Sequence, residues 1–392
     1  MDHRRTIIRR TREAIANQME ETLHVIRQHR EPFGQGDEPA RSSWRLRRAV
    51  AEAAAGLPPD AQAAVAQIPF GRGIAEPELE PEREAIQHIV DAGASAVEPL
   101  LREKSPDLTA EQILGLEFLW LLYIRPILPI GRRGEMASPP SSWKVIEDER
   151  ASIDEVLRSV GQIQLLGHPE YDWVGSGFLV GQNCLMTTRQ TAEVFAKRTA
   201  EGKWQFHPGI SAWIDFQAED HVQTAAACRV LSILGVHQQY DLALLEVESP
   251  PGTSLGPIEP LNLSHEPPSQ IEGRPAYMVG YPIRDSRRDE PERLANAFRD
   301  CYNVKAVHLG RLCGQRHFGD AQLLEHDCAM LGCVRGSCLM DLATHQVLGM
   351  HVAGRFLQKS TAIPLWVLRD DPLMRSAGLR FTAAPTGKST TA

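Results

Sequence analysis

The second half of the chain consists of short apolar runs that alternate with turn residues, and this pattern constrains the fold more than any other feature. The runs are rich in Val, Ile, Leu and aromatic residues and read QIQLLG, GSGFLVG, CLMTT, SAWIDF, CRVLSILGVH, DLALLEVE, AYMVGYP and VLGMHVAG. Short runs bounded by turn residues are typical of strands. The pattern therefore predicts a sheet-rich barrel or sandwich rather than alternating strands and helices.

The first third of the chain has a helical pattern instead. Apolar residues near helical spacing are Ile8, Ile15, Met19, Leu23 and Ile26, and similar patterns run through 45–55, 82–103 and 110–124. Thr109 with Gln112 fits a capping box at the start of the last of these helices. We find no repeat of fixed period, which argues against a helical solenoid.

These patterns divide the chain into four parts. We predict a helical module over 1–130, a linker over 131–142, a β-rich domain over 143–375 and a flexible tail over 376–392. The linker, GRRGEMASPPSS, is rich in Gly, Pro and Ser. The expected fold class is α+β multidomain, with an all-α amino-terminal module followed by an all-β domain that one helix over Glu147–Val160 opens.

Charge and hydropathy indicate a cytoplasmic protein. The net charge is -8, which argues against a nucleic-acid partner. Residues 1–50 hold an excess of basic side chains, which we interpret as a solvated helix rather than a nucleic-acid or membrane patch. The start, MDHRRTIIRRTREA, lacks the apolar core of a signal peptide. The apolar run Ile113–Ile124 is too short to span a bilayer, so we expect no membrane association.

The cysteines support the same compartment. They are Cys184, Cys228, Cys301, Cys313, Cys328, Cys333 and Cys338, an odd set without a CxxC pair. Free thiols are the rule in a reducing cytoplasm. No histidine stands at zinc-finger spacing, and we expect neither a metal nor another cofactor.

Three stretches of the β-rich half follow one another in the order of a known family. WVGSGFLVGQNCLMTTRQTAEVF begins at Trp173, YDLALLEVE at Tyr240 and LGCVRGSCLMDLATHQVLGMHVAG at Leu331. They resemble the GTGFLV and LxTNxHV, DxALLxV, and GGNSGSPVxDxxTGxVxGLHxAG motifs of the bacterial trypsin-like, chymotrypsin-fold serine peptidases. The resemblance implies a trypsin-like double β-barrel over 143–375.

The resemblance also implies where a catalytic triad would lie, and two of its three positions hold unsuitable side chains. Gln190 stands at the histidine position, Asp241 at the acid position and Arg335 at the nucleophile position. A glutamine has no group that titrates near neutral pH, and an arginine is permanently charged. Cys333 replaces a glycine whose amide joins the oxyanion hole. Ala329 stands at the specificity-pocket position and carries no charge.

Other residues of suitable chemistry are poorly placed. Ser337 lies two residues beyond the nucleophile position, and in the family that serine packs behind the nucleophile. Cys333 and Cys338 flank the same position, but a buried thiol without a base stays protonated. We interpret three further histidines as structural, and these are His351 on a core strand and His168 and His237 in loops.

We therefore expect a degenerate, catalytically inactive pseudopeptidase that acts as a binding, scaffold or regulatory subunit for a protein partner. The resemblance implies a setting in bacterial defence or signalling systems. The charged segment Arg284–Arg293 is interpreted as solvated surface, or else as a partner-binding or cleavable loop. Two alternatives stay open: an active serine or cysteine endopeptidase with a non-standard nucleophile, and a substrate that a partner protease processes.

The altered triad also permits a structural prediction. We expect Arg335, Asp241 and Gln190 to form a hydrogen-bonded cluster that plugs the former catalytic cleft, with the Gln190 amide donating to the carboxylate. In the alternative arrangement Arg335 turns into solvent and Asp241 is bonded only to backbone amides.

Overall fold

The structure is a computed structural model, and it describes most of the β-rich half. The described residues are 88, 91–93, 95–96, 99, 107–119, 121, 124–131, 134–136, 139–140, 143–218, 226–250, 252, 256–283, 302–354 and 359–383. Most of the predicted helical module lies outside the described residues. The charged loop 284–293 and most of the predicted tail also lie outside them.

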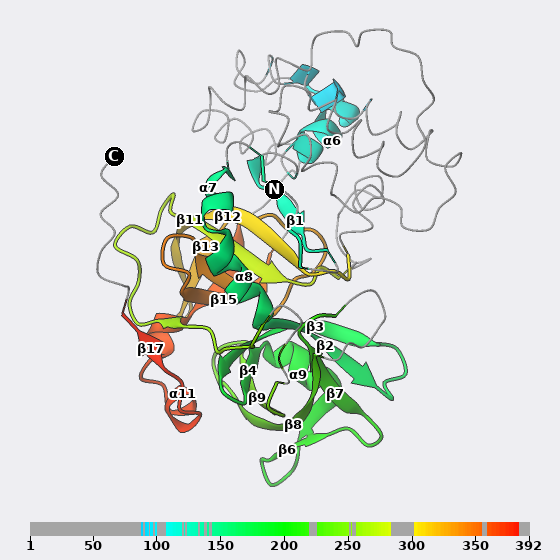
Figure 1. Ribbon diagram of the computed structural model, residues 1–392, viewed down its shortest axis with the longest axis vertical. Coiled ribbons are helices and arrows are strands. Elements are labelled where there is room, and N and C mark those ends of the chain that lie inside the picture. The colour runs from blue at the N-terminus through cyan, green and yellow to red at the C-terminus, as the bar shows by residue number, and fades with distance from the viewer. Residues whose placement is uncertain are drawn as a thin grey trace.

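Six antiparallel strands close into the first barrel, drawn in green in Figure 1. In hydrogen-bonded order they are β2 (Val160–Leu166), β3 (Trp173–Gly181), β4 (Cys184–Thr187), β9 (Ala243–Val247), β8 (Ala227–Val236) and β7 (Ser211–Asp215). The barrel closes because β2 pairs with β7 as well as with β3. Its interior is apolar, and Ile163, Leu185, Ile214 and Leu245 are fully buried there. The helix α9 (Arg189–Phe195) and the hairpin of β5 (Ala196–Arg198) and β6 (Trp204–Phe206) connect β4 to β7.

A second six-stranded barrel follows in the chain. Its strands are β14 (Cys338–Asp341), β11 (Pro275–Gly280), β12 (Ala306–Phe318), β13 (Ala321–His326), β16 (Ser360–Pro364) and β15 (Val347–Ala353). Pairing of β15 back to β14 closes the ring. Three short strands extend the sheet, namely β1 (Ile127–Pro129), β10 (Leu263–Ser264) and β17 (Phe381–Thr382). The two closed barrels confirm the predicted trypsin-like double β-barrel.

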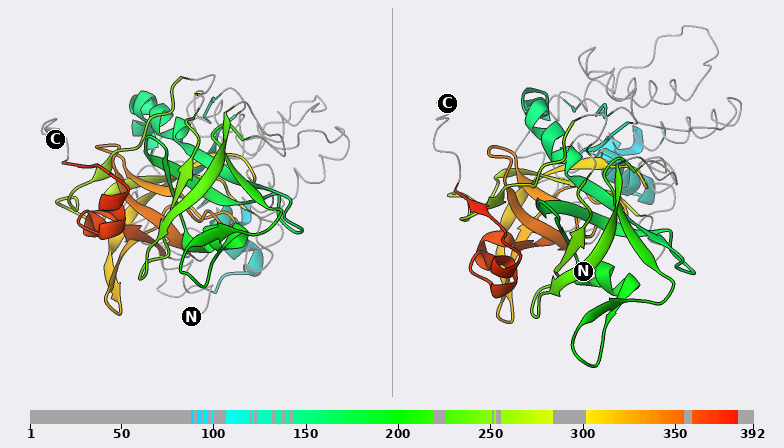
Figure 2. Two further views of the ribbon diagram at one scale, coloured as in Figure 1. Left: turned by 90° about the horizontal axis from the view of Figure 1, so that it is seen from below. Right: turned by 60° about the horizontal axis from the view of Figure 1, so that its bottom comes forward.

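One buried apolar cluster joins the barrels, which lie side by side in both views of Figure 2. Phe178 of the first barrel and Val279 and Met340 of the second are fully buried in this cluster. Ile153 of α8 (Arg150–Arg158) is buried in the same cluster. Burial of apolar surface stabilises by roughly 25 cal/mol per Å², so a shared core makes the barrels one packed unit.

A capping box in the sequence explains where one helix begins. At the start of α6 (Ala110–Leu119) the Thr109 amide donates to Gln112 Oε1 at 2.9 Å, and the Gln112 amide donates to Thr109 Oγ1 at 3.1 Å. The predicted capping box is thereby confirmed. The carboxyl-terminal part adds η5 (Leu365–Leu368) and α11 (Pro372–Ser376), and α7 (Val145–Asp148) precedes α8. Within the described residues, no helix has the length and apolar character needed to cross a membrane.

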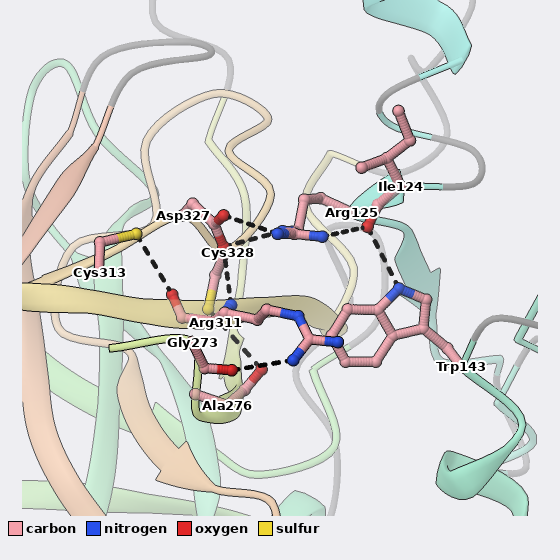
Figure 3. A network of polar contacts seen from close by, with 9 residues as sticks. All are labelled: Ile124, Arg125, Trp143, Gly273, Ala276, Arg311, Cys313, Asp327 and Cys328. Carbon is pink, nitrogen blue, oxygen red and sulfur yellow. Dashed lines mark hydrogen bonds and ion pairs between the residues drawn. The ribbon is translucent and has the colours of Figure 1, made fainter. Parts of the chain in front are cut away.

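The segment before the β-rich domain docks on the second barrel. Strand β1 pairs antiparallel with the first residues of β12. Arg125 donates from Nε and Nη2 to the two carboxylate oxygens of Asp327, both at 2.8 Å (Figure 3). The Trp143 indole donates to the Ile124 carbonyl at 3.2 Å. Its ring lies 6.0 Å from the Arg125 guanidinium and 5.8 Å from that of Arg311.

This docking differs from the organisation that the sequence suggests. The prediction ends the helical module at residue 130, but residues 127–129 form a strand of the second sheet. Ile127 and Leu128 are apolar like the run before Arg125, but Pro126 and Pro129 are incompatible with a helix interior. Inside the predicted linker, the Gly131 amide donates to the Glu135 carbonyl at 2.7 Å. The domain boundaries stay a prediction, but Arg150 of α8 donates from Nη2 to the Gly134 carbonyl at 2.9 Å and so attaches this stretch.

Limited proteolysis within 131–142 is therefore expected to cut the chain without separating the pieces. Strand pairing and the Arg125–Asp327 ion pair hold the amino-terminal fragment on the barrel after the cut. The measurement is native size-exclusion chromatography of the digest, in which both fragments are expected to elute together. Elution of two independent fragments from the wild-type digest would contradict the docking.

Candidate functional site

Gln190 lies in the first turn of α9, beside the turn that carries Asp241. Thr188 caps the start of the helix, because its Oγ1 accepts from the Thr191 amide at 3.1 Å. Amides in the first turn have no acceptor within a helix. The Gln190 amide instead donates to Asp241 Oδ1 at 3.0 Å. The helix start therefore satisfies the carboxylate at the acid position of the triad, without an imidazole.

Arg189 holds the Asp241 turn against the same helix. Its Nη2 donates to the His237 carbonyl at 2.7 Å and also to the Tyr240 carbonyl. Guanidinium bonds to carbonyl oxygens are charge-assisted and shorter than neutral ones. Arg189 is thus a structural cation, and its neighbour Gln190 remains at the surface.

Arg335 connects the second barrel to the first. Its Nη1 donates to Gln190 Oε1 at 2.8 Å. Its carbonyl accepts from the Ser176 amide of β3 at 3.1 Å, which anchors the backbone of the turn. We call Gln190, Asp241 and Arg335 the junction cluster, because their hydrogen bonds cross from one barrel to the other.

The structure brings the three residues together, but not as a buried plug. Gln190 is exposed, and Asp241 and Arg335 are half-buried. Asp241 is bonded through the backbone of Gln190, whereas we expected the side-chain amide to donate. No ion pair joins Arg335 to a carboxylate of the described residues. The reason is local, since the first-turn amide of α9 already meets Asp241 and leaves the Gln190 side chain for Arg335.

In the turn that carries Arg335, the amide at the Cys333 oxyanion-hole position is already hydrogen-bonded. Gly332 and Gly336 have φ of +59° and +78°, a region that favours glycine. The Cys333 amide donates to the Ile283 carbonyl at 2.8 Å, and the Ile283 amide donates back to the Cys333 carbonyl at 2.8 Å. An oxyanion hole needs unengaged donors aimed at the reacting oxygen. The amide at the Cys333 position is engaged elsewhere.

The other candidate nucleophiles are buried. Ser337 has no exposed surface, and its Oγ donates to the Val334 carbonyl at 2.7 Å. Burial raises the pKa of the Cys338 thiol to about 12, so this thiol stays protonated at neutral pH. Cys333 is buried as well. These environments favour packing over nucleophilic attack.

The three histidines that the sequence left in structural roles have structural partners. His351 Nδ1 lies 3.1 Å from His326 Nε2 inside the second barrel. His237 Nε2 lies 3.2 Å from Asp371 Oδ2. His168 Nδ1 accepts backbone amides of its own loop at 3.1 Å. All three contacts lie outside the junction cluster.

Ala329, at the specificity-pocket position, has a buried histidine beside it that sequence reasoning missed. His308 Nδ1 lies 3.1 Å from the Ala329 carbonyl. Burial lowers the pKa of His308 to about 4, so its imidazole is neutral at physiological pH. A histidine within a mixed polar and apolar stretch carries no pattern that would have placed it there. Among the side chains whose positions are described, no group of three or more His, Cys, Asp or Glu residues could hold a metal ion.

Comparison with known proteins agrees with this fold. Residues 175–350 match the family model of the trypsin-like peptidase domain. The matched residues run from β3 to β15 and so extend through both barrels. We find no match among curated proteins.

Two solved structures are similar at low identity. A serine endoprotease from Yersinia pestis is 13% identical, covering 58% of this chain and 67% of that chain with a TM-score of 0.38. The active form of a protease from M. tuberculosis is 16% identical, covering 63% of this chain and 92% of that chain with a TM-score of 0.40. The assignment of the fold rests on the two closed barrels.

Proposed function

We propose that this protein is a pseudopeptidase, which keeps a trypsin-like double barrel to bind a protein partner and does not hydrolyse peptides. One observation carries the proposal. The side chains at the base and nucleophile positions, Gln190 and Arg335, are hydrogen-bonded to each other at 2.8 Å. Neither can accept a proton from a nucleophile or attack a carbonyl at neutral pH.

The rest of the site supports the same conclusion. Hydrolysis also needs an oxyanion hole, and the Cys333 amide donates to Ile283 instead. Ser337 would need both exposure and a base, and it has no exposed surface. These observations weigh against a working endopeptidase with a non-standard nucleophile. We propose a binding, scaffold or regulatory role in the cytoplasm, and co-purification from native cells identifies the partner.

The purified protein is expected to release no product from casein or from a peptide library. Fluorophosphonate probes are expected to leave it unlabelled, because loss of triad members leaves only a residual rate of about 10³ to 10⁴ over water in well-studied triads. The measurement compares wild type with Ser337→Ala and Cys333→Ala, which are expected to be equally inactive. Turnover that survives purification and disappears in either variant would make the protein an enzyme.

A further inference from the structure

Arg335 has a guanidinium edge that no described residue uses. Its Nη1 donates to Gln190 Oε1, and the remaining donors lie on Nε and Nη2. The side chain is half-buried rather than enclosed, so an external group can reach it. A permanently charged group with open donors at the junction of two barrels is suited to bind a ligand of opposite charge.

Two other arginines of the same chain show what this edge binds. Arg125 donates from Nε and Nη2 to Asp327, at 2.8 Å for both bonds. Arg274 donates from the same two nitrogens to Asp341, at 3.0 and 2.7 Å. In each pair a planar carboxylate meets the side of the guanidinium through two parallel bonds. At Arg335 the described part of the chain supplies no carboxylate to this edge.

Gln190 increases the number of donors at the same place. Its side-chain oxygen accepts from Arg335, so the exposed amide group can offer its Nε2 hydrogens to a ligand. Asp241 accepts from the Gln190 backbone and forms no ion pair with Arg335. The outward face of the junction cluster therefore combines a cationic edge with a neutral donor, which matches an oxygen-bearing anion.

We propose that Arg335 and Gln190 bind the side-chain carboxylate of an Asp or Glu residue in a partner peptide. The side-on edge of a guanidinium fits two carboxylate oxygens in one plane. The inference rests on the proposed function in one respect, because only a domain that does not hydrolyse its ligand would keep such a peptide in place. It adds the chemical class of that ligand, an acidic peptide.

The test begins with random peptides displayed on phage and selected on the full-length protein. Wild type is expected to enrich Asp and Glu, whereas Arg335→Gln is expected to lose this enrichment. A selected peptide, amidated at its carboxyl terminus, is then titrated beside its Glu→Gln counterpart. Loss of a charge-assisted pair is expected to weaken binding roughly 10- to 100-fold.

Matched variants separate charge from geometry. Arg335→Lys keeps the charge and loses the planar edge, so its affinity is expected to lie between those of wild type and Arg335→Gln. Arg316→Gln removes an exposed arginine outside the junction cluster and is expected to bind like wild type. Circular dichroism of each variant checks that the fold is intact.

The outcomes distinguish this inference from the function on which it rests. Peptides that bind equally well with Gln in place of Glu, or to Arg335→Gln, would overturn the carboxylate site and leave the pseudopeptidase standing. Binding that requires only a free carboxyl terminus, or no binding of any peptide, would also overturn the site. Cleavage of the selected peptide would overturn the proposed function itself.

Discussion

Arg125→Ala is expected to lower the free energy of unfolding by about 3 to 5 kcal/mol, because removal of one partner leaves the other charge of a buried pair uncompensated. The pair is enclosed, with the two side chains 7% and 14% exposed. Asp327 Oδ1 also accepts from the Arg311 amide at 2.7 Å, so part of its charge stays hydrogen-bonded in the variant. The measurement is urea denaturation of wild type and variant.

A double-mutant cycle makes this test specific. Arg125→Ala and Asp327→Ala are measured singly and together, and their coupling free energy reports the pair. Arg316→Ala breaks an ion pair with Glu325 whose arginine is 51% exposed, and it is expected to cost about 1 kcal/mol or less. Additive losses at Arg125 and Asp327 would show that the pair does not hold the segment.

The loss of stability expected for Arg125→Ala concerns the junction cluster as well, because Asp327 lies close in sequence to the turn that carries Arg335. It precedes Ala329 by two residues, and the same loop leads to Arg335. The segment that carries Arg125 is therefore attached to the loop that presents the Arg335 guanidinium. Figure 3 shows the contact, with Trp143 beside Arg125 and Arg311.

The barrels could be predicted from the sequence wherever a strand is a continuous apolar run. The runs around Phe178, Leu244 and Met350 all became β-strands. The sequence pattern did not predict strand β12 (Ala306–Phe318), because this strand mixes His, Arg and Gly with apolar residues. Two of its polar side chains meet carbonyls of other segments, since His308 Nδ1 lies 3.1 Å from the Ala329 carbonyl and Arg311 donates to the Gly273 carbonyl. Such partners are distant in sequence and leave no local pattern.

The junction cluster was predictable in composition but not in exposure. Matching the motifs placed Gln190, Asp241 and Arg335 near one another, and two hydrogen bonds connect them. Which atom of Gln190 meets Asp241 depends on the start of α9, where the backbone amide is free. Burial depends on the loops around the cluster, and motif spacing contains no information about them.

A second large effect is expected from Lys305, a buried lysine that connects the barrels. Its Nζ donates to the Leu157 carbonyl at 2.5 Å and to the Phe216 carbonyl at 2.7 Å. Both acceptors lie outside the second barrel, at the end of α8 and directly after β7. The ammonium also lies 5.7 Å from the ring centre of Tyr281. Burial lowers the pKa of Lys305 to about 7. The nearby charge of Asp215 raises this pKa, but the effect of burial is larger.

Lys305 is therefore expected to make the free energy of unfolding rise with pH between about 7 and about 10, by up to about 1.4 kcal/mol per pH unit. The sign follows from proton counting. In this interval the unfolded chain keeps the lysine protonated, at a pKa of about 10.4, while the folded protein has released the proton. The unfolded state then binds more protons, so raising the pH favours the folded state. Below pH 7 both states are protonated, and the full cost of the buried charge is present.

The measurement is urea denaturation across this pH range for wild type and Lys305→Met, under reducing conditions. Burial raises the pKa of the Cys184, Cys228 and Cys338 thiols to about 12, which lowers stability as pH rises and opposes the lysine. Because both proteins contain these thiols, the difference between their slopes reports Lys305. Lys359→Met removes a lysine that is 48% exposed and is expected to keep the wild-type slope. Equal slopes in wild type and Lys305→Met would mean that Lys305 stays charged between the barrels, stabilised by its two carbonyls.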